Sequence, residues 1–354
     1  MSRPGDRPNE SDVTREGLRG PLRSARDAMT GVATGRAEPR RGRDRRGEQA
    51  MVPSAEFGSY YGRPVLNPPT WQAHDIAGYL FLGGLAGASS LLGAGAQETG
   101  RPGLSKVSKL GAIGAITLSL VALVDDLGRP LRFLNMLRVV KPTSPMSLGT
   151  WLLSGYAPLA GIAAASDVTG RAPRIGAAAT AGAAILGPAV ASYTAVLFSD
   201  TAVPAWHEGY REMPFVFVGS AAAAAGGLGL LAAPTGETGP ARMFALLGVG
   251  MELGAFELMR RRIGMIAEAY STGTAGRLIR ASKILALVGA GTALLGRHRR
   301  LAGALSGVAL LGASAATRFG VFHAGVASAE DPKYTVVPQR ERLRRREGQV
   351  PQAR

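Results

Sequence analysis

Apolar and polar residues alternate along this chain on the length scale of a lipid bilayer. From Trp71 onward, runs of about 20 mostly apolar residues recur, and a helix of that length crosses the hydrocarbon layer of a membrane. Segments that carry charge, Pro or Gly separate these runs. The pattern predicts an all-α integral membrane protein with eight transmembrane helices in a bundle, at residues 73–96, 107–127, 147–166, 175–198, 214–233, 240–259, 280–296 and 300–318.

Proline and charged residues predict further features of these runs. Pro188 lies within the fourth run and is expected to kink that helix. The last two runs are short and flank the segment GRHRRL (296–301), which predicts a tight hairpin. A soluble, Ala-rich helical protein is the alternative. Repeated runs of bilayer length between charged loops favour the membrane protein.

The two ends of the chain differ from this central region, for which we predict a membrane domain at 56–328. Residues 1–55 are rich in Arg, Gly, Pro, Asp and Glu and cannot bury enough apolar surface to fold, which predicts a disordered basic tail. That tail is either an arm for RNA or anionic lipid or a solvated extension, and we favour the extension, with no nucleic-acid partner. Residues 329–354 are predicted to form a basic, polar C-terminal tail.

Composition narrows the chemistry. The chain has 354 residues, 46% of them hydrophobic, with a formal net charge of +16, so apolar blocks alternate with basic segments. Its 49 Gly suit close packing of helices in lipid. The absence of Cys excludes Cys-ligated iron–sulfur clusters, and two of the four His, His207 and His298, fall in polar connections. We therefore expect no haem, no iron–sulfur cluster and no metal site in this chain.

Lys and Arg near the predicted span ends are nearly balanced between the two membrane faces. Eight spans would place both termini on one side, and the Arg-rich tails tip the balance toward cytoplasmic termini under the positive-inside rule. We therefore expect a multi-pass protein of the cell (cytoplasmic) membrane, with the lipid bilayer as a partner.

Polar residues at the span ends gather on the terminus side, and ionisable residues in such places are candidates for function. Each also has an ordinary interpretation: Trp71 and Tyr193 as interfacial aromatics, Arg129 as a topology charge, and Glu252 and Glu257 as ion-pair partners of nearby Arg. The opposite face offers only ordinary loops. The candidates on the terminus side include Trp71, His74, Asp75, Asp125, Asp126, Arg129, Ser144, Tyr193, Glu252 and Glu257.

This set of residues suits the headgroup of a quinone. A quinone needs hydrogen-bond donors at its two carbonyl oxygens, a group that exchanges protons, and apolar walls for its ring and tail. Tyr or His can donate to the carbonyl, and a carboxylate can relay the proton to water. The same residue types also serve ion or proton pathways in transporters, and residue types alone do not separate the two functions.

Several segments carry a family resemblance. They include WQAHDIAGYLFLGGLAGASSLL (71–92), DLGRPLRFLNMLRVVKPTSPMSLGTWLL (126–153) and SYTAVLFSDTAVPAWHEGYREMPFVFVGSAAAAAGG (192–227), with others at 251–285 and 318–343. The Pro-Thr-Ser-Pro motif before the third run and the Tyr…Pro-x-Trp pattern after the fourth are its more specific parts. From about Tyr60 to Leu343 the chain resembles the polysulfide reductase membrane-subunit family of the NrfD/PsrC type.

That resemblance implies a membrane subunit that binds menaquinone or a similar diffusible quinone. Its implied partners are a ferredoxin-like iron–sulfur subunit and, beyond it, a molybdopterin catalytic subunit. Tyr193 matches the family's quinone-contacting Tyr. The family's Asn and His in the first span align with Ile76 and Tyr79, so this sequence departs there, and His74 and Asp75 lie just before. The expected quinone site comprises Tyr193, His74, Asp75, Tyr79, Trp71, Ser144 and Trp151.

A second group of residues is expected to relay protons or form ion pairs, namely Asp125, Asp126, Arg129, Glu252 and Glu257. Adjacent helical residues point about 100° apart, so only one of the two aspartates can face the interior. Asp126 belongs to the family-like DLGRP segment and is expected to pair near that turn, which leaves Asp125 for proton traffic. Two alternatives stay open: a proton- or ion-translocating module, and an anchor subunit without a working quinone site.

Overall fold

The computed structural model describes residues 65–67, 69, 71–126, 135–138, 140–295 and 299–349, which form helices and no strand. Seven helices in this part of the chain are long and apolar enough to cross a membrane, which confirms the all-α membrane class. They are α3 (Ala73–Glu98), α4 (Pro102–Asp126), α6 (Pro145–Thr169), α7 (Pro173–Ser199), α9 (Met213–Ala232), α11 (Gly273–Leu295) and α12 (Arg300–Glu330).

The remaining expected span, 240–259, corresponds to α10 (Gly239–Arg262), a helix of 24 residues. Its charged residues, which include Glu252, Glu257 and three consecutive Arg at its end, keep it out of the seven apolar helices. The predicted total of eight spans therefore stays a prediction. Between the long helices lie the short α8 (Pro204–His207), η1 (Thr235–Glu237) and η2 (Gly264–Tyr270).

Three regions bear on local predictions. α12 continues to Glu330, well beyond the expected end at residue 318, because no Pro interrupts the helix before Pro332. Part of the expected polar tail forms α13 (Lys333–Gln349). Pro188 lies inside α7, and the kink expected there stays a prediction. The predicted disordered tail at 1–55 and the first half of the predicted GRHRRL turn (296–298) lie outside the described residues.

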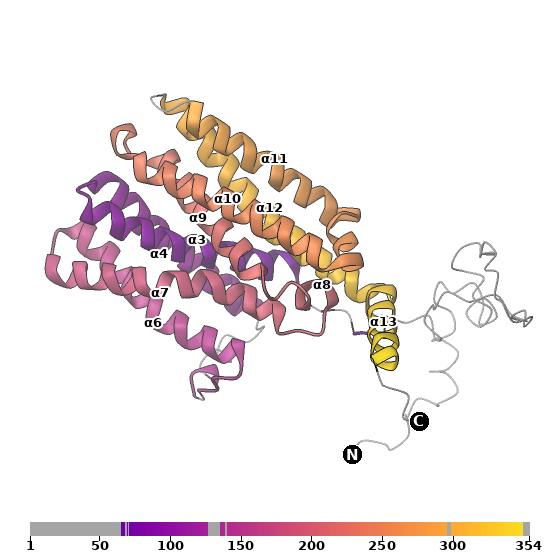
Figure 1. The fold of residues 1–354 in the computed structure, drawn as a ribbon. Helices are drawn as coiled ribbons and strands as arrows, with labels where there is room; N and C mark the ends of the chain where they lie inside the picture. The colour runs from indigo at the N-terminus through magenta and orange to yellow at the C-terminus, as the bar shows by residue number, and fades with distance from the viewer. Residues whose placement is uncertain are drawn as a thin grey trace, which may run out of the picture. The chain divides into compact units, whose positions relative to one another are not determined.

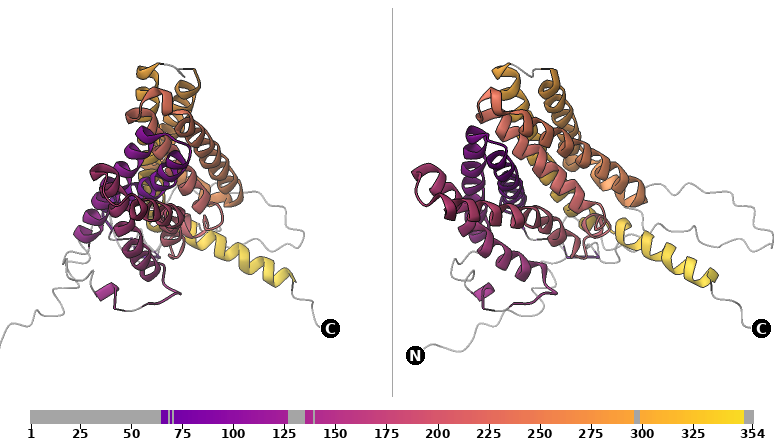
Figure 2. Two further views of the ribbon diagram at one scale, coloured as in Figure 1. Left: turned by 90° about the vertical axis from the view of Figure 1, so that its left-hand side faces the viewer. Right: turned by 60° about the vertical axis from the view of Figure 1, so that its left-hand side comes forward.

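The chain divides into two compact units, and the larger one, Pro69–Ser328, contains the bundle. In its N-terminal half, α3 packs against α4 and α7, and α6 packs against α7. In its C-terminal half, α10 packs mainly against α9. α9 also contacts α3 and α7, and thereby joins the two halves (Figure 1). Figure 2 shows the same grouping from two further sides.

Glycine pairs allow the closest helix crossings. A Cβ built on Gly87 of α3 would overlap the carbonyl of Gly187 in α7, and the reverse also holds. A Cβ on Gly219 of α9 would lie 2.6 Å from the backbone nitrogen of Glu252 in α10. Helices in lipid associate through such close packing, because lipid tails are as apolar as Leu. These crossings explain in part why the chain is rich in Gly.

Candidate functional site

Aromatic side chains stack where the start of α3, the end of α7 and α8 meet. The Phe198 and Trp206 rings lie 4.4 Å apart at an interplanar angle of 6°. Trp71, just before α3, stacks on Trp206 with ring centroids 5.8 Å apart. Phe217 and Phe322 contact the same stack from α9 and α12. An apolar, planar wall therefore lines this end of the bundle.

Hydrogen bonds to α12 and η2 hold α8 in place. The Trp206 indole N–H donates to the Val321 carbonyl at 2.8 Å, and a Cβ on Gly325 would overlap the indole ring. The backbone N–H of Ala205 donates to the Ser328 hydroxyl, and the Tyr270 hydroxyl donates to the Ala205 carbonyl at 2.7 Å. The site predicted from sequence does not include Trp206, although this residue lies in the Pro-x-Trp pattern that carries the resemblance.

The first turns of α3 place a carboxylate on the buried face. Asp75 is 8% exposed, and Tyr79, one helical turn later, is buried on the same face. The His74 side chain is 72% exposed, and its Nε2 lies 3.3 Å from Asp75 Oδ1. The structure therefore separates these predicted residues: Asp75 and Tyr79 face inward, whereas His74 links Asp75 to the outside of the bundle.

Tyr193 lies half-buried between α7 and α6. Its ring occupies the space that a Cβ on Gly149 would need, with the ring carbon Cζ 2.8 Å from that position. None of the described residues forms a hydrogen bond with the Tyr193 hydroxyl, and the same holds for the Tyr79 hydroxyl and the Trp71 indole N–H. By contrast, the Tyr156 hydroxyl is bonded to Ser90 at 2.7 Å. Three of the predicted quinone residues thus carry a donor with no partner among the described residues.

The other predicted quinone residues lie at the start of α6. Ser144 is the half-buried residue before its first turn. Trp151 is 42% exposed, as expected for a side chain that faces lipid. The predicted quinone residues thus fall into two subgroups. Tyr193 lies against α6, the helix of Ser144 and Trp151, whereas Trp71 packs against the last turns of α7.

The two aspartates after the second run are only partly described. Asp125 is exposed at the end of α4 because it shares a helix face with Leu118 and Val121, which are also exposed. Asp125 therefore lies on the exposed face of α4, and its predicted role in proton traffic stays a prediction. The side chain of Asp126 and all of Arg129 lie outside the described residues.

The two glutamates of α10 differ sharply. Glu257 pairs with Arg260 and Arg261 at 2.9 Å each, as its local spacing predicted. Glu252 is buried, and its Oε1 accepts a hydrogen bond from the Thr317 hydroxyl at 2.5 Å, while its Oε2 has no partner among the described residues. Ser282 Oγ lies 2.5 Å from the same Thr317 oxygen.

Arg318 follows Thr317 on α12 and is fully buried. Its Nη2 donates to the Phe217 carbonyl at 2.8 Å, and its guanidinium lies 3.8 Å from the Phe217 ring centroid. Its Nε and Nη1 have no partner within the described part of the chain. Glu252 and Arg318 attract each other electrostatically, so the C-terminal half of the bundle contains a buried polar centre.

A further ion pair joins the ends of two neighbouring helices. Arg262, at the end of α10, donates two hydrogen bonds at 2.7 Å to Glu212, which precedes α9, and a third to the Glu208 carbonyl. The hydrogen bond from Arg262 holds the pKa of the Glu212 carboxyl below its ordinary value. This pair fixes the loop between α8 and α9 to the end of α10.

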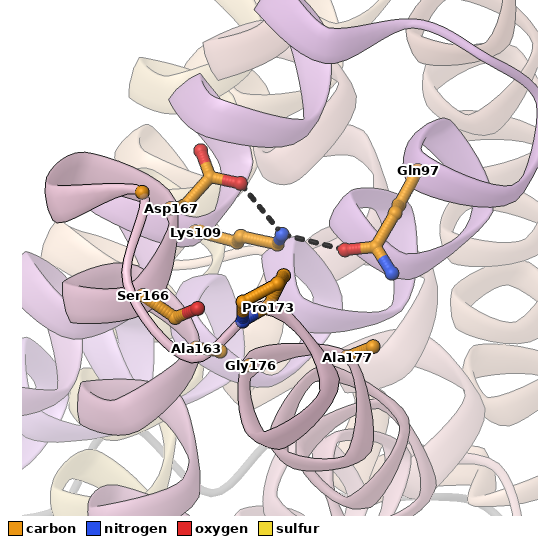
Figure 3. Close-up of a pocket in the computed structure, with 9 residues that line it drawn as sticks. Gln97, Lys109, Ala163, Ser166, Asp167, Pro173, Gly176 and Ala177 are labelled. Atoms are coloured by element: carbon orange, nitrogen blue, oxygen red, sulfur yellow. Dashed lines mark hydrogen bonds and ion pairs between the residues drawn. The ribbon is translucent and has the colours of Figure 1, made fainter.

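The opposite face of the bundle also carries buried charge. Lys109 of α4 is 6% exposed, and its Nζ donates to Asp167 at 2.9 Å and to Gln97 at 2.7 Å. These residues line a pocket of about 350 Å³ (Figure 3). The prediction that this face offers only ordinary loops is therefore wrong. Lys109 and Asp167 come from different helices, so their pairing leaves no local signal in the sequence.

Comparisons with known proteins identify a family. The model of the family described as polysulphide reductase, NrfD, matches residues 65–260, which is more than half of the 354-residue chain. No curated protein matches this chain. Across the described residues, no group of His, Asp and Glu is arranged to hold a metal ion.

Proposed function

This chain belongs to the NrfD family of polysulphide reductases, and we propose that it is the quinone-reactive membrane subunit of an oxidoreductase complex. Members of this family are membrane subunits of redox complexes and interact with quinones. The proposal adds that this subunit passes electrons between a menaquinone-type pool and a docked iron–sulfur subunit. A molybdopterin catalytic subunit lies beyond that partner, and the termini face the cytoplasm.

The free hydroxyl of Tyr193 is the observation that carries this proposal. The Tyr193 side chain is half-buried, and its hydroxyl has no hydrogen-bond partner among the described residues. A quinone carbonyl supplies the missing acceptor. Tyr79 and Trp71 hold two further donors that have no partner among the described residues, and Trp71 stacks on Phe198 and Trp206. A quinone has two carbonyl oxygens that can accept from such donors and a planar ring that can stack on such a wall.

Asp75 and His74 supply the route for protons. The quinone provides two-electron, two-proton redox chemistry when it is bound. Asp75 accepts or returns a proton on the buried face of α3, and His74 exchanges it with water, because the two side chains lie 3.3 Å apart and His74 is exposed. The chain itself needs no metal for either step.

The test is a Tyr193→Phe variant of the full-length chain in lipid nanodiscs. Loss of one hydrogen bond of about 1 kcal/mol weakens binding about fivefold. Binding of a water-soluble naphthoquinone is followed by quenching of tryptophan fluorescence, since Trp71 lies at the site. The matched control is Tyr156→Phe, which removes a hydroxyl that already has a partner.

The expected result is weaker quinone binding for Tyr193→Phe and unchanged binding for Tyr156→Phe. In membranes that hold the assembled complex, Tyr193→Phe should also slow quinol-linked electron transfer. Equal binding by wild type and Tyr193→Phe, with normal electron transfer, would refute the quinone role of Tyr193 and favour the anchor function.

A second candidate function is proton translocation, and the buried centre around Glu252 favours it. The Glu252 carboxylate lies inside the bundle close to Thr317 and Arg318, and its Oε2 has no partner among the described residues. Burial of such a group in a membrane protein is costly, which makes it a candidate for function. In proteoliposomes of the complex, Glu252→Gln should abolish quinol-driven proton movement while quinol oxidation continues. Glu257→Gln on the same helix is the control, because Glu257 forms only exposed ion pairs. Unchanged proton movement in Glu252→Gln would exclude this candidate.

A further inference from the structure

The pocket beside Lys109 has no part in the proposed quinone chemistry. It lies at the end of α3 that carries Gln97, whereas Trp71 and Asp75 lie at the start of that helix, about 35 Å away along the helix axis. Asp167 lies in the last turn of α6, and Pro173 begins α7. The pocket is therefore at a membrane face, at the depth of lipid headgroups, rather than in the middle of the bilayer.

The pocket presents both donors and an acceptor. In Figure 3, Lys109 extends between Asp167 on one side and Gln97 on the other. A lysine ammonium has three N–H donors, and these two bonds use two of them. Asp167 Oδ2 and the side-chain N–H groups of Gln97 have no partner among the described residues. One wall thus supplies hydrogen-bond donors and the other supplies a carboxylate oxygen.

Small residues leave space beside these polar groups. Ala163, Gly170, Gly176 and Ala177 line the remaining walls together with Ser166 and Pro173. The volume of about 350 Å³ lies within the range of small-ligand pockets. A headgroup can therefore enter without displacing a large side chain.

The balance of charge selects the ligand. The charges of Lys109 and Asp167 neutralise each other. A purely anionic ligand is therefore repelled by Asp167, and a purely cationic ligand is repelled by Lys109. A ligand with one group of each sign satisfies both, because its anion takes the Lys109 and Gln97 donors and its cation donates to Asp167. Charge-assisted hydrogen bonds of this kind are about twice as strong as neutral ones.

We propose that this pocket binds a zwitterionic headgroup in which a primary ammonium and a phosphate are joined by a short linker, as in phosphatidylethanolamine. The phosphate oxygens accept from Lys109 and Gln97, and the ammonium donates to Asp167. The apolar side chains of Ile162 and Val168 in α6 and Ile175 in α7 are exposed and offer a surface for the acyl chains. This inference does not depend on the quinone function.

Two alanines on α7 give a matched pair of variants. Ala177 lines the pocket and Ala178 does not, and both are exposed on the same helix. Ala177→Leu fills the pocket and leaves its charges in place, whereas Ala178→Leu adds the same side chain elsewhere. A third variant, Asp167→Asn, removes the acceptor charge for the ammonium.

The experiment measures lipid binding to the full-length chain in detergent by native mass spectrometry. Short-chain phosphatidylethanolamine is compared with phosphatidylcholine, which has no N–H on its cation, and with phosphatidylglycerol, which has no cation. One charge-assisted hydrogen bond contributes about tenfold in affinity, so we expect phosphatidylethanolamine to bind about tenfold more tightly than either. Ala177→Leu and Asp167→Asn should lose this preference, and Ala178→Leu should keep it.

Soluble phosphoethanolamine distinguishes the source of the headgroup. If it competes with the lipid only weakly, the ligand is the membrane lipid; if it binds as tightly as the lipid, the same chemistry recognises a free compound. Equal binding of the three lipids, tighter binding of phosphatidylglycerol, or identical behaviour of Ala177→Leu and Ala178→Leu would overturn the proposal.

Discussion

Replacing Gly87 with Ala tests the close crossing of α3 and α7. A Cβ at Gly87 would overlap the Gly187 carbonyl oxygen and lie 3.0 Å from its carbon. Carbon atoms pack favourably at about 3.5–4.0 Å, so the helices must separate by at least about 0.5 Å. A gap of this size weakens the van der Waals attraction between α3 and α7 wherever the two helices touch. We therefore expect Gly87→Ala to destabilise the bundle.

The size of this effect follows from a matched control, Gly95→Ala. Gly95 is on the same helix, is exposed, and has no atom within 4 Å of a built Cβ. Both variants gain up to about 1 kcal/mol from the higher helix propensity of Ala. Overpacking costs about 1–3 kcal/mol, and only Gly87→Ala incurs this cost. The free energy of unfolding of Gly87→Ala should therefore lie about 1–3 kcal/mol below that of Gly95→Ala.

The assay is reversible unfolding of the full-length chain in mixed micelles, with an increasing fraction of a denaturing detergent. Helix content reports unfolding, and the two variants are compared with the wild type under the same conditions. Equal unfolding free energies for Gly87→Ala and Gly95→Ala would show that the helices do not depend on this contact. The reasoning about close packing would then fail.

Three further predictions concern the candidate site and its surroundings. Trp206→Phe keeps an aromatic ring in the stack but loses the indole hydrogen bond, so the free energy of unfolding should fall by about 1 kcal/mol or more, measured in the same micelle assay. Glu212 has a lowered pKa, so its ion pair with Arg262 stabilises the fold above the ordinary glutamate pKa of about 4.3, and this stabilisation is lost as pH falls through the lowered value. The thermal unfolding temperatures of wild type and Glu212→Gln should therefore differ at pH 7 and converge in acid. Gly149→Ala displaces the Tyr193 ring and should weaken naphthoquinone binding, whereas Gly155→Ala, where the added Cβ makes only an ordinary contact, should bind normally.

Sequence patterns located the helices well because the length of an apolar run is a local property. The long runs became helices that begin and end close to the expected residues. There are two exceptions. α11 begins at Gly273 rather than residue 280. α12 continues past residue 318, because residues 319–330 include His323 and Glu330 and end the apolar run without ending the helix. Helix formation needs suitable backbone propensities and no proline, whereas a lipid-length run also needs apolar side chains.

The candidate site was harder to predict because it depends on how each helix is rotated about its axis. The pairing of Glu257 with Arg260 was open to prediction, since residues three apart on one helix are neighbours. The Lys109–Asp167 pair joins different helices, and the buried bond between Glu252 and Thr317 spans 65 positions. The exposure of Asp125 likewise follows from the face of α4 that the other helices leave uncovered.

The attachment of α8 to α12 connects the aromatic stack to the helix that carries Arg318. Val321, Gly325 and Ser328 lie on successive turns of a single helix and all contact α8. Arg318 lies on the same face, one turn before Val321. A helix is stiff along its axis, so a partner that pushes α8 shifts α12 and with it the guanidinium in the bundle core. The aromatic stack and the buried guanidinium are therefore joined through one continuous helix.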